Sequence, residues 1–70
     1  MIPSENERNA IQSLTCPLCK NKVGWDFENN DDQPNMLILY CKNDEACGIE
    51  IRKLQTFGWP ATIDYWRNLK

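Results

Sequence analysis

The chain has 70 residues, enough for one domain but too few to enclose a large hydrophobic core. Eight basic and ten acidic side chains give a formal net charge of −2, which argues against extensive nucleic-acid binding but not against a local basic patch. The N-terminus is polar and acidic, and the longest apolar run, residues 36–41, is too short to span a membrane. We therefore expect a single domain over residues 1–70, located in the cytoplasm.

Two cysteine pairs are the strongest signal in the chain. Two residues separate Cys16 from Cys19, and five separate Cys41 from Cys47. Each pair can place two sulfur atoms on one turn, a knuckle, and two knuckles together supply the ligands of a closed structural zinc site. Disulfides are the alternative in an oxidising compartment. An iron–sulfur centre is a further alternative, but the lysines beside both pairs indicate exposed turns. We expect one structural Zn²⁺, on which folding depends.

The first element expected is a short helix over residues 4–14. Ser4 and Glu7 have the spacing of a capping box, and Ala10, Ile11 and Leu14 form a narrow apolar stripe. We expect this helix to pack on the sheet, with an arm that binds a partner as the alternative. In the first knuckle, which lacks a glycine after its second cysteine, Asn21 is expected to take the left-handed backbone conformation.

Three strands are expected in and after the two knuckles. Residues 23–28 alternate between large apolar residues and polar residues or glycine, as in a half-buried strand. Residues 36–40 are apolar throughout, which predicts burial on both faces of the sheet. Something must then cover the side that water would otherwise meet, and the two terminal helices are the only candidates. Residues 49–52 alternate again, after Gly48, whose position favours a positive φ.

A second helix is expected over residues 60–69, after a break at Gly58-Trp59-Pro60. The fold class is therefore a small α+β zinc ribbon. Its three-stranded antiparallel sheet lies within residues 16–52, and a helix lies at each end. A catalytic zinc keeps an open coordination position, whereas four cysteines close the site. The chain also has no histidine. We expect no enzymatic activity and no catalytic residues.

The aromatic residues suggest a surface for a partner. Trp25 and Trp66 are expected in the core, whereas Trp59, beside a glycine and a proline, is the best candidate for an exposed anchor. The candidate interface comprises Phe57, Trp59, Tyr65 and Arg67. A homodimer through the apolar segment around Trp59 is an alternative. A small basic patch near the second knuckle, or simply a solvated face, is expected for Lys42, Arg52 and Lys53.

Short motifs resemble those of the phage and prophage restriction-alleviation protein Lar family. They are Leu14-Thr15-Cys16-Pro17-Leu18-Cys19, Cys47-Gly48, and the closing segment Thr62-Ile63-Asp64-Tyr65-Trp66-Arg67-Asn68. The longer second knuckle, the missing glycine after the first and the order Arg67-Asn68 depart from the family pattern. The resemblance implies a small zinc ribbon that is phage-borne and has an anti-defence role. It would bind a host restriction-modification protein or another defence component.

A second resemblance implies a different partner. Tyr40-Cys41-Lys42-Asn43 and Cys47-Gly48 are similar to the phage late-control zinc-finger transcription activators. This likeness implies contact with DNA and RNA polymerase, for which more positive charge is expected than this chain carries. The acidic balance favours binding to a host protein, with the DNA-contacting regulator as the alternative.

Overall fold

The computed structural model describes residues 2–43 and 47–69, which form two helices and one sheet. In chain order the elements are α1 (Glu5–Gln12), β1 (Val23–Glu28), β2 (Met36–Cys41), β3 (Glu50–Leu54), a 3-10 turn (Gln55–Phe57) and α2 (Gly58–Arg67). The strand order is β1-β2-β3, and both pairs are antiparallel. The expected small α+β fold with a three-stranded antiparallel sheet and two helices is confirmed.

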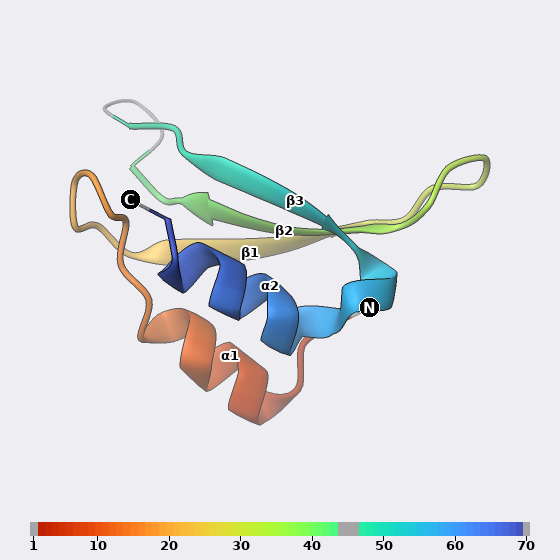
Figure 1. The fold of residues 1–70 in the computed structure, drawn as a ribbon, viewed down its shortest axis with the longest axis horizontal. Coiled ribbons are helices and arrows are strands. Elements are labelled where there is room, and N and C mark those ends of the chain that lie inside the picture. The colour runs from red at the N-terminus through yellow and green to blue at the C-terminus, as the bar shows by residue number, and fades with distance from the viewer. Residues whose placement is uncertain (1, 44–46, 70) are drawn as a thin grey trace.

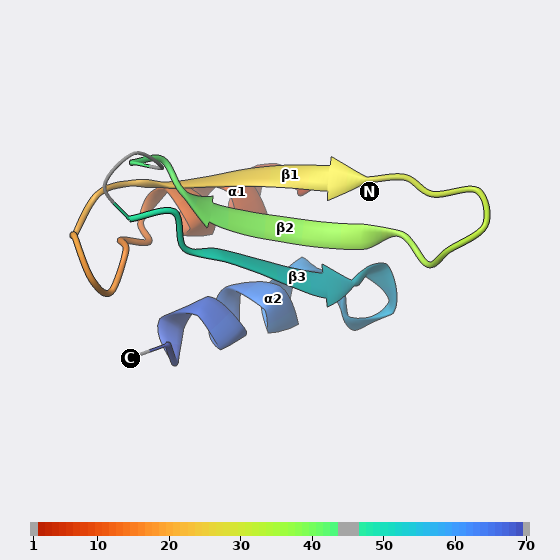
Figure 2. The ribbon, with the colours of Figure 1, turned by 90° about the horizontal axis from the view of Figure 1, so that it is seen from above.

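Both helices cover the same face of the sheet (Figures 1 and 2). Leu37 and Leu39 of β2 are fully buried against them, and Trp59, Ile63 and Trp66 of α2 complete this core. Alternate residues of a strand point to opposite faces. The residues between these leucines therefore face away from both helices. The helices thus cover one face of the sheet, and the residues of the apolar run on the other face are buried without a helix over them.

Side chains of the sheet itself cover the second face. Ile38 is only 5% exposed there, although neither helix lies over it. Its neighbour in register, Arg52, forms ion pairs with Glu28 at 2.8 Å and Glu50 at 3.2 Å. The arginine stem thereby lies along the apolar surface while its guanidinium stays at the water. Short apolar stretches can therefore be buried on a face that no further element covers.

Tyr40 also covers this second face, because its ring lies over Gly24 of β1. A Cβ atom added to Gly24 would lie 2.5 Å from Cζ of Tyr40, so the phenol ring occupies the space where a side chain would stand. We expect Gly24→Ala to destabilise the domain by about 1–3 kcal/mol, because the ring must move. Chemical denaturation measures this cost. In a Tyr40→Ala background the same substitution is expected to be nearly neutral, and an equal cost in both backgrounds would contradict the packing described.

The helix boundaries differ from those expected by a few residues. The capping box is present, with the Ser4 N–H donating to Glu7 at 2.8 Å and the Glu7 N–H donating to Ser4 Oγ at 3.2 Å. α1 ends at Gln12, before Leu14, which is nevertheless buried. α2 begins at Gly58 and ends at Arg67, two residues earlier at each end than expected. Among the described residues, no helix has the length and apolar character that crossing a bilayer requires.

The third strand runs further than its alternation predicted. It continues to Leu54, which pairs with Met36, and the N–H of Gln55 then donates to Asn35 at 3.0 Å. The β1–β2 hairpin loop and the two knuckles consequently lie at opposite ends of the sheet (Figure 1). This arrangement gathers all four cysteines at one end.

Candidate metal centre

The first knuckle is a tight turn that leads into β1. The N–H of Cys16 donates to the carbonyl of Asn21 at 2.8 Å, and the N–H of Lys20 donates to the carbonyl of Cys16 at 3.0 Å. Closing this turn requires one residue with a positive φ, and Lys20 takes it, at 64°. The expectation that Asn21 adopts this conformation is wrong. The turn requires the positive φ one residue earlier, directly after Cys19.

The second knuckle begins at the end of β2. Cys41 is the last residue of that strand, and its N–H donates to the carbonyl of Ile49 at 2.8 Å. The N–H of Cys47 donates to the carbonyl of Asn43 at 3.0 Å, and Gly48 follows with a φ of 68°, as its position predicted. The position of Cys41 therefore depends on the pairing of β2 within the sheet, whereas the position of Cys47 depends on its local hydrogen bond to Asn43.

The two knuckles bring all four cysteines of the described chain together. Their Sγ atoms lie within 4.8 Å of one another, and all four thiols are free. Sγ of Cys16 is 3.3 Å from that of Cys47, and Sγ of Cys19 is 3.4 Å from that of Cys41. Tetrahedral Zn–S bonds of about 2.3 Å place neighbouring sulfurs roughly 3.8 Å apart. The cluster therefore fits a single metal ion.

Hydrogen bonds prepare the first knuckle to hold its sulfurs as thiolates. Burial acts to raise the pKa of Cys16, but the backbone N–H groups of Cys19 and Leu18 outweigh it, so the pKa is lowered. The side-chain amide and then the backbone N–H of Asn21 lower the pKa of Cys19 to about 6. N–H groups directed at a sulfur favour its charged form. Asn21 thus supports a ligand, a role that its sequence position alone did not indicate.

In the second knuckle the pKa values of both cysteines are raised rather than lowered. Burial raises the pKa of Cys41 to about 12, against the effect of the backbone N–H of Asn43. The hydrogen bond with the Cys16 sulfur, followed by burial, raises the pKa of Cys47. A bound dication favours the thiolate at each ligand, so metal and protons compete mainly at this knuckle.

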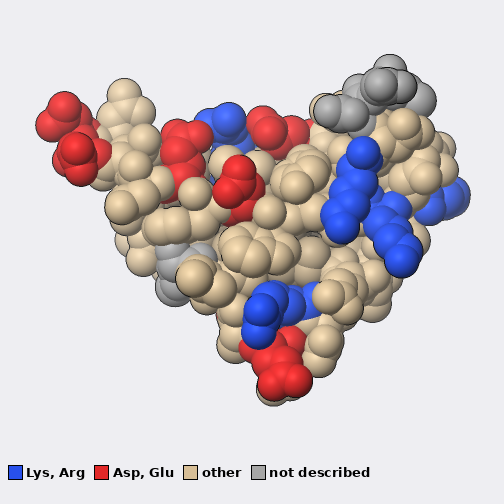
Figure 3. Space-filling model, turned by 180° about the vertical axis from the view of Figure 1, so that it is seen from behind, with Lys and Arg blue, Asp and Glu red and all other residues tan. Residues whose placement is uncertain are grey.

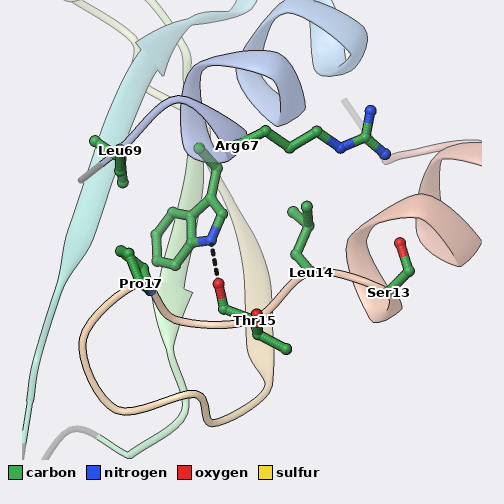
Figure 4. A pocket seen from close by; sticks show the side chains of 7 residues that line it. Ser13, Leu14, Thr15, Pro17, Arg67 and Leu69 are labelled. Carbon is green, nitrogen blue, oxygen red and sulfur yellow. Dashed lines mark hydrogen bonds between the residues drawn. The ribbon is translucent and has the colours of Figure 1, made fainter.

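α2 is tied to the first knuckle by Trp66. Its indole Nε1–H donates to the carbonyl of Thr15 at 3.0 Å, one residue before the first cysteine (Figure 4). Trp66 is 2% exposed, so this bond lies at the edge of the core, beside a cavity of about 310 Å³ that Pro17 and Arg67 help to line. The helix and the candidate metal centre therefore support each other.

The structure brings together only Phe57 and Tyr65 of the four residues of the expected partner interface. Trp59 is completely buried, with its ring 5.9 Å from that of Trp25 in an edge-to-face arrangement, so the expectation of an exposed anchor is wrong. Phe57 and Tyr65 are exposed at 61% and 45%. Trp66 lies in the core as expected, and Trp25 packs against it, half-buried. The alternative of a homodimer through the apolar segment around Trp59 stays a prediction, with the exposed Phe57 rather than Trp59 available for such a contact.

Two further expectations about charge and surface need correction. Arg67 lies on a different side of α2 from Phe57 and Tyr65 and interacts with Asp64 at 3.8 Å. Of the two alternatives for Lys42, Arg52 and Lys53, the small basic patch does not form, whereas a solvated face describes the exposed Lys42 and Arg52. Arg52 pairs with acidic residues on the open face of the sheet. Lys53 Nζ lies 3.6 Å from the centre of the Tyr65 ring, beside α2.

The fold and the cysteine cluster define the class of this protein as a small α+β domain with a candidate metal centre of four cysteines. No family model, no curated protein and no solved structure matches the chain.

Proposed function

We propose that the chain is a non-enzymatic zinc-ribbon protein of the cytoplasm. The observation that carries this proposal is the cluster of Cys16, Cys19, Cys41 and Cys47, whose Sγ atoms lie within 4.8 Å of one another. Soft thiolate ligands suit Zn²⁺, and four of them leave no open coordination position for a substrate. When bound, the ion cross-links the two knuckles. The function then belongs to the surfaces that this cross-link holds in place.

We propose that one of these surfaces binds a host protein. Phe57 and Tyr65 line a depression of about 200 Å³ with Ala61 and Lys53. Ala61 and Tyr65 of α2 and its N-cap residue Phe57 recur every four positions, so they lie along one side of the helix. Exposed aromatic side chains beside a cation are frequent anchors in protein interfaces. Arg67 and Trp59 are not part of this surface.

The Lar resemblance supports restriction-modification, or another defence system, as the process concerned. A phage-borne protein of this kind would dampen or redirect the host system by contact with one of its proteins. RNA polymerase is the alternative partner, which the likeness to late-control activators supports.

We expect the double substitution Phe57→Ala and Tyr65→Ala to abolish partner binding without unfolding the domain. The partner is captured from host lysate on the immobilised zinc-loaded chain and identified by mass spectrometry. Ile2→Ala with Leu18→Ala is the matched control, because these residues are 73% and 67% exposed elsewhere on the molecule. A protein retained equally by all three forms would contradict the proposed surface.

The restriction proposal has its own test. Expression of the chain in a restricting host is expected to raise the plating efficiency of unmodified phage, and the Phe57→Ala and Tyr65→Ala form is expected to lose this effect. An unchanged plating efficiency, together with capture of RNA polymerase, would favour the transcription alternative.

A further inference from the structure

Four cations of the described chain have no acidic partner. Arg52 and Arg67 form ion pairs, and Lys53 lies over the Tyr65 ring. Within residues 2–43 and 47–69, the remaining basic side chains are all exposed and make no ion pair; they are Arg8, Lys20, Lys22 and Lys42. A cation that no carboxylate neutralises stays available for an external anion.

Arg8 and Lys42 lie at the β1 edge beside α1, and Lys20 and Lys22 follow the first knuckle into the same strand. The N–H of Lys42 donates to the carbonyl of Lys22 at 3.0 Å, which places these two lysines side by side at the knuckle end. Figure 3 shows this side, with basic side chains at the knuckle end and over α1. Acidic side chains gather towards the β1–β2 hairpin and at the start of α1. The negative net charge is thus unevenly distributed.

A groove of about 190 Å³ runs between α1 and β1 on this side. Its lining includes Arg8 and Gln12 of α1, Trp25 of β1, and Tyr40 and Lys42 from β2 and its end. None of its described lining residues is acidic. The Tyr40 ring has one side against Gly24, and both aromatic side chains of the groove are half-buried. Trp25 lies on the helix face of β1 and the Tyr40 ring on the open face, so the hollow extends around the β1 edge and combines one aromatic side chain on each face with two cations.

We infer that this groove binds single-stranded nucleic acid, with the four cations contacting phosphates and the aromatic side chains contacting bases. Basic grooves with aromatic platforms are how proteins hold single strands. A duplex keeps its bases stacked inside, and an acidic protein segment has no need of the aromatic surfaces. The site is separate from the Phe57 and Tyr65 surface and does not depend on the protein partner proposed there.

Fluorescence anisotropy with a fluorescein-labelled oligothymidylate of twelve nucleotides tests this inference on the zinc-loaded chain. Four phosphate contacts predict a slope of log K against log salt of about −2.8. Lys22→Gln with Lys42→Gln is expected to halve this slope and to weaken binding on the order of tenfold at low salt. Lys53→Gln with Arg67→Gln removes the same charge from outside the groove, and is expected to leave binding within about twofold of the original.

Tyr40→Leu is expected to weaken binding about fivefold or more at unchanged salt slope, with folding checked by circular dichroism. Equal losses in both double variants would overturn the inference, since net charge alone would then explain binding. A duplex of the same length that binds more tightly would also overturn it. So would poly-L-glutamate that displaces the oligonucleotide at equal charge concentration, because the groove would then be a site for acidic protein.

Discussion

Cys41→Ser is expected to release the zinc ion and unfold the domain. Cys41 is 1% exposed, ends β2 and supplies a sulfur 3.4 Å from that of Cys19. Structural zinc binding contributes about 10–16 kcal/mol in zinc-finger peptides, whereas a typical domain is stable by only about 5–15 kcal/mol. The loss of one ligand therefore removes more free energy than the small core can replace. Circular dichroism and elemental analysis of the purified protein measure both effects.

The neighbouring substitution Tyr40→Phe serves as the control for Cys41→Ser. It keeps the ring over Gly24 and alters no sulfur, so the variant should retain its metal and its fold. Cys41→His is expected to recover part of the metal binding, because imidazole is also a zinc ligand. A Cys41→Ser protein that remains folded with a full complement of metal would refute the four-ligand assignment.

Trp59→Ala is expected to destabilise the domain by about 3–5 kcal/mol, because it opens a cavity at the centre of the core. Trp59 is 0% exposed and packs edge-to-face on Trp25. Phe57→Ala is the matched control: an aromatic residue two positions away, but 61% exposed, whose loss should cost no more than about 0.5 kcal/mol. Urea denaturation of the zinc-loaded proteins measures both. Similar costs for the two variants would contradict the burial described.

The burial of Trp59 could not be predicted as long as the second helix was taken to begin at Pro60. Trp59, Ile63 and Trp66 stand at positions i, i+4 and i+7, the stripe of a core-facing helix. That stripe includes Trp59 only if the helix starts at Gly58, as it does. Glycine and proline indicated a break, but the break lies on the N-terminal side of Gly58, whose φ of 79° turns the chain.

Local patterns predicted the elements well, because each rests on neighbouring residues. The capping box, the three strands and the convergence of the cysteine pairs follow from spacing alone. The burial of the second face of the sheet does not follow from the spacing of residues. It depends on Tyr40 crossing to Gly24 and on Arg52 reaching Glu28, contacts that the register of paired strands creates. The basic groove could not be predicted either, since Arg8 and Lys42 line the same groove only in the folded chain.

Each of the two proposed surfaces lies on elements that are connected to the candidate metal centre. The aromatic surface lies on α2, whose Trp66 bonds to Thr15 beside the first knuckle. The basic groove lies between α1 and β1, and Lys42 directly follows Cys41 of the candidate metal centre. Loss of metal should therefore impair both surfaces together, whereas the surface substitutions should impair them separately.

The dependence of folding on zinc is tested by titration of the metal-free, reduced chain with Zn²⁺, followed by circular dichroism and mass spectrometry under native conditions. We expect an unfolded metal-free chain that folds as zinc is added, with the transition complete at one ion per chain, and that unfolds again on chelation. A chain that is fully folded without metal, or that folds only when its cysteines are oxidised to disulfides, would refute a structural zinc site of four cysteines.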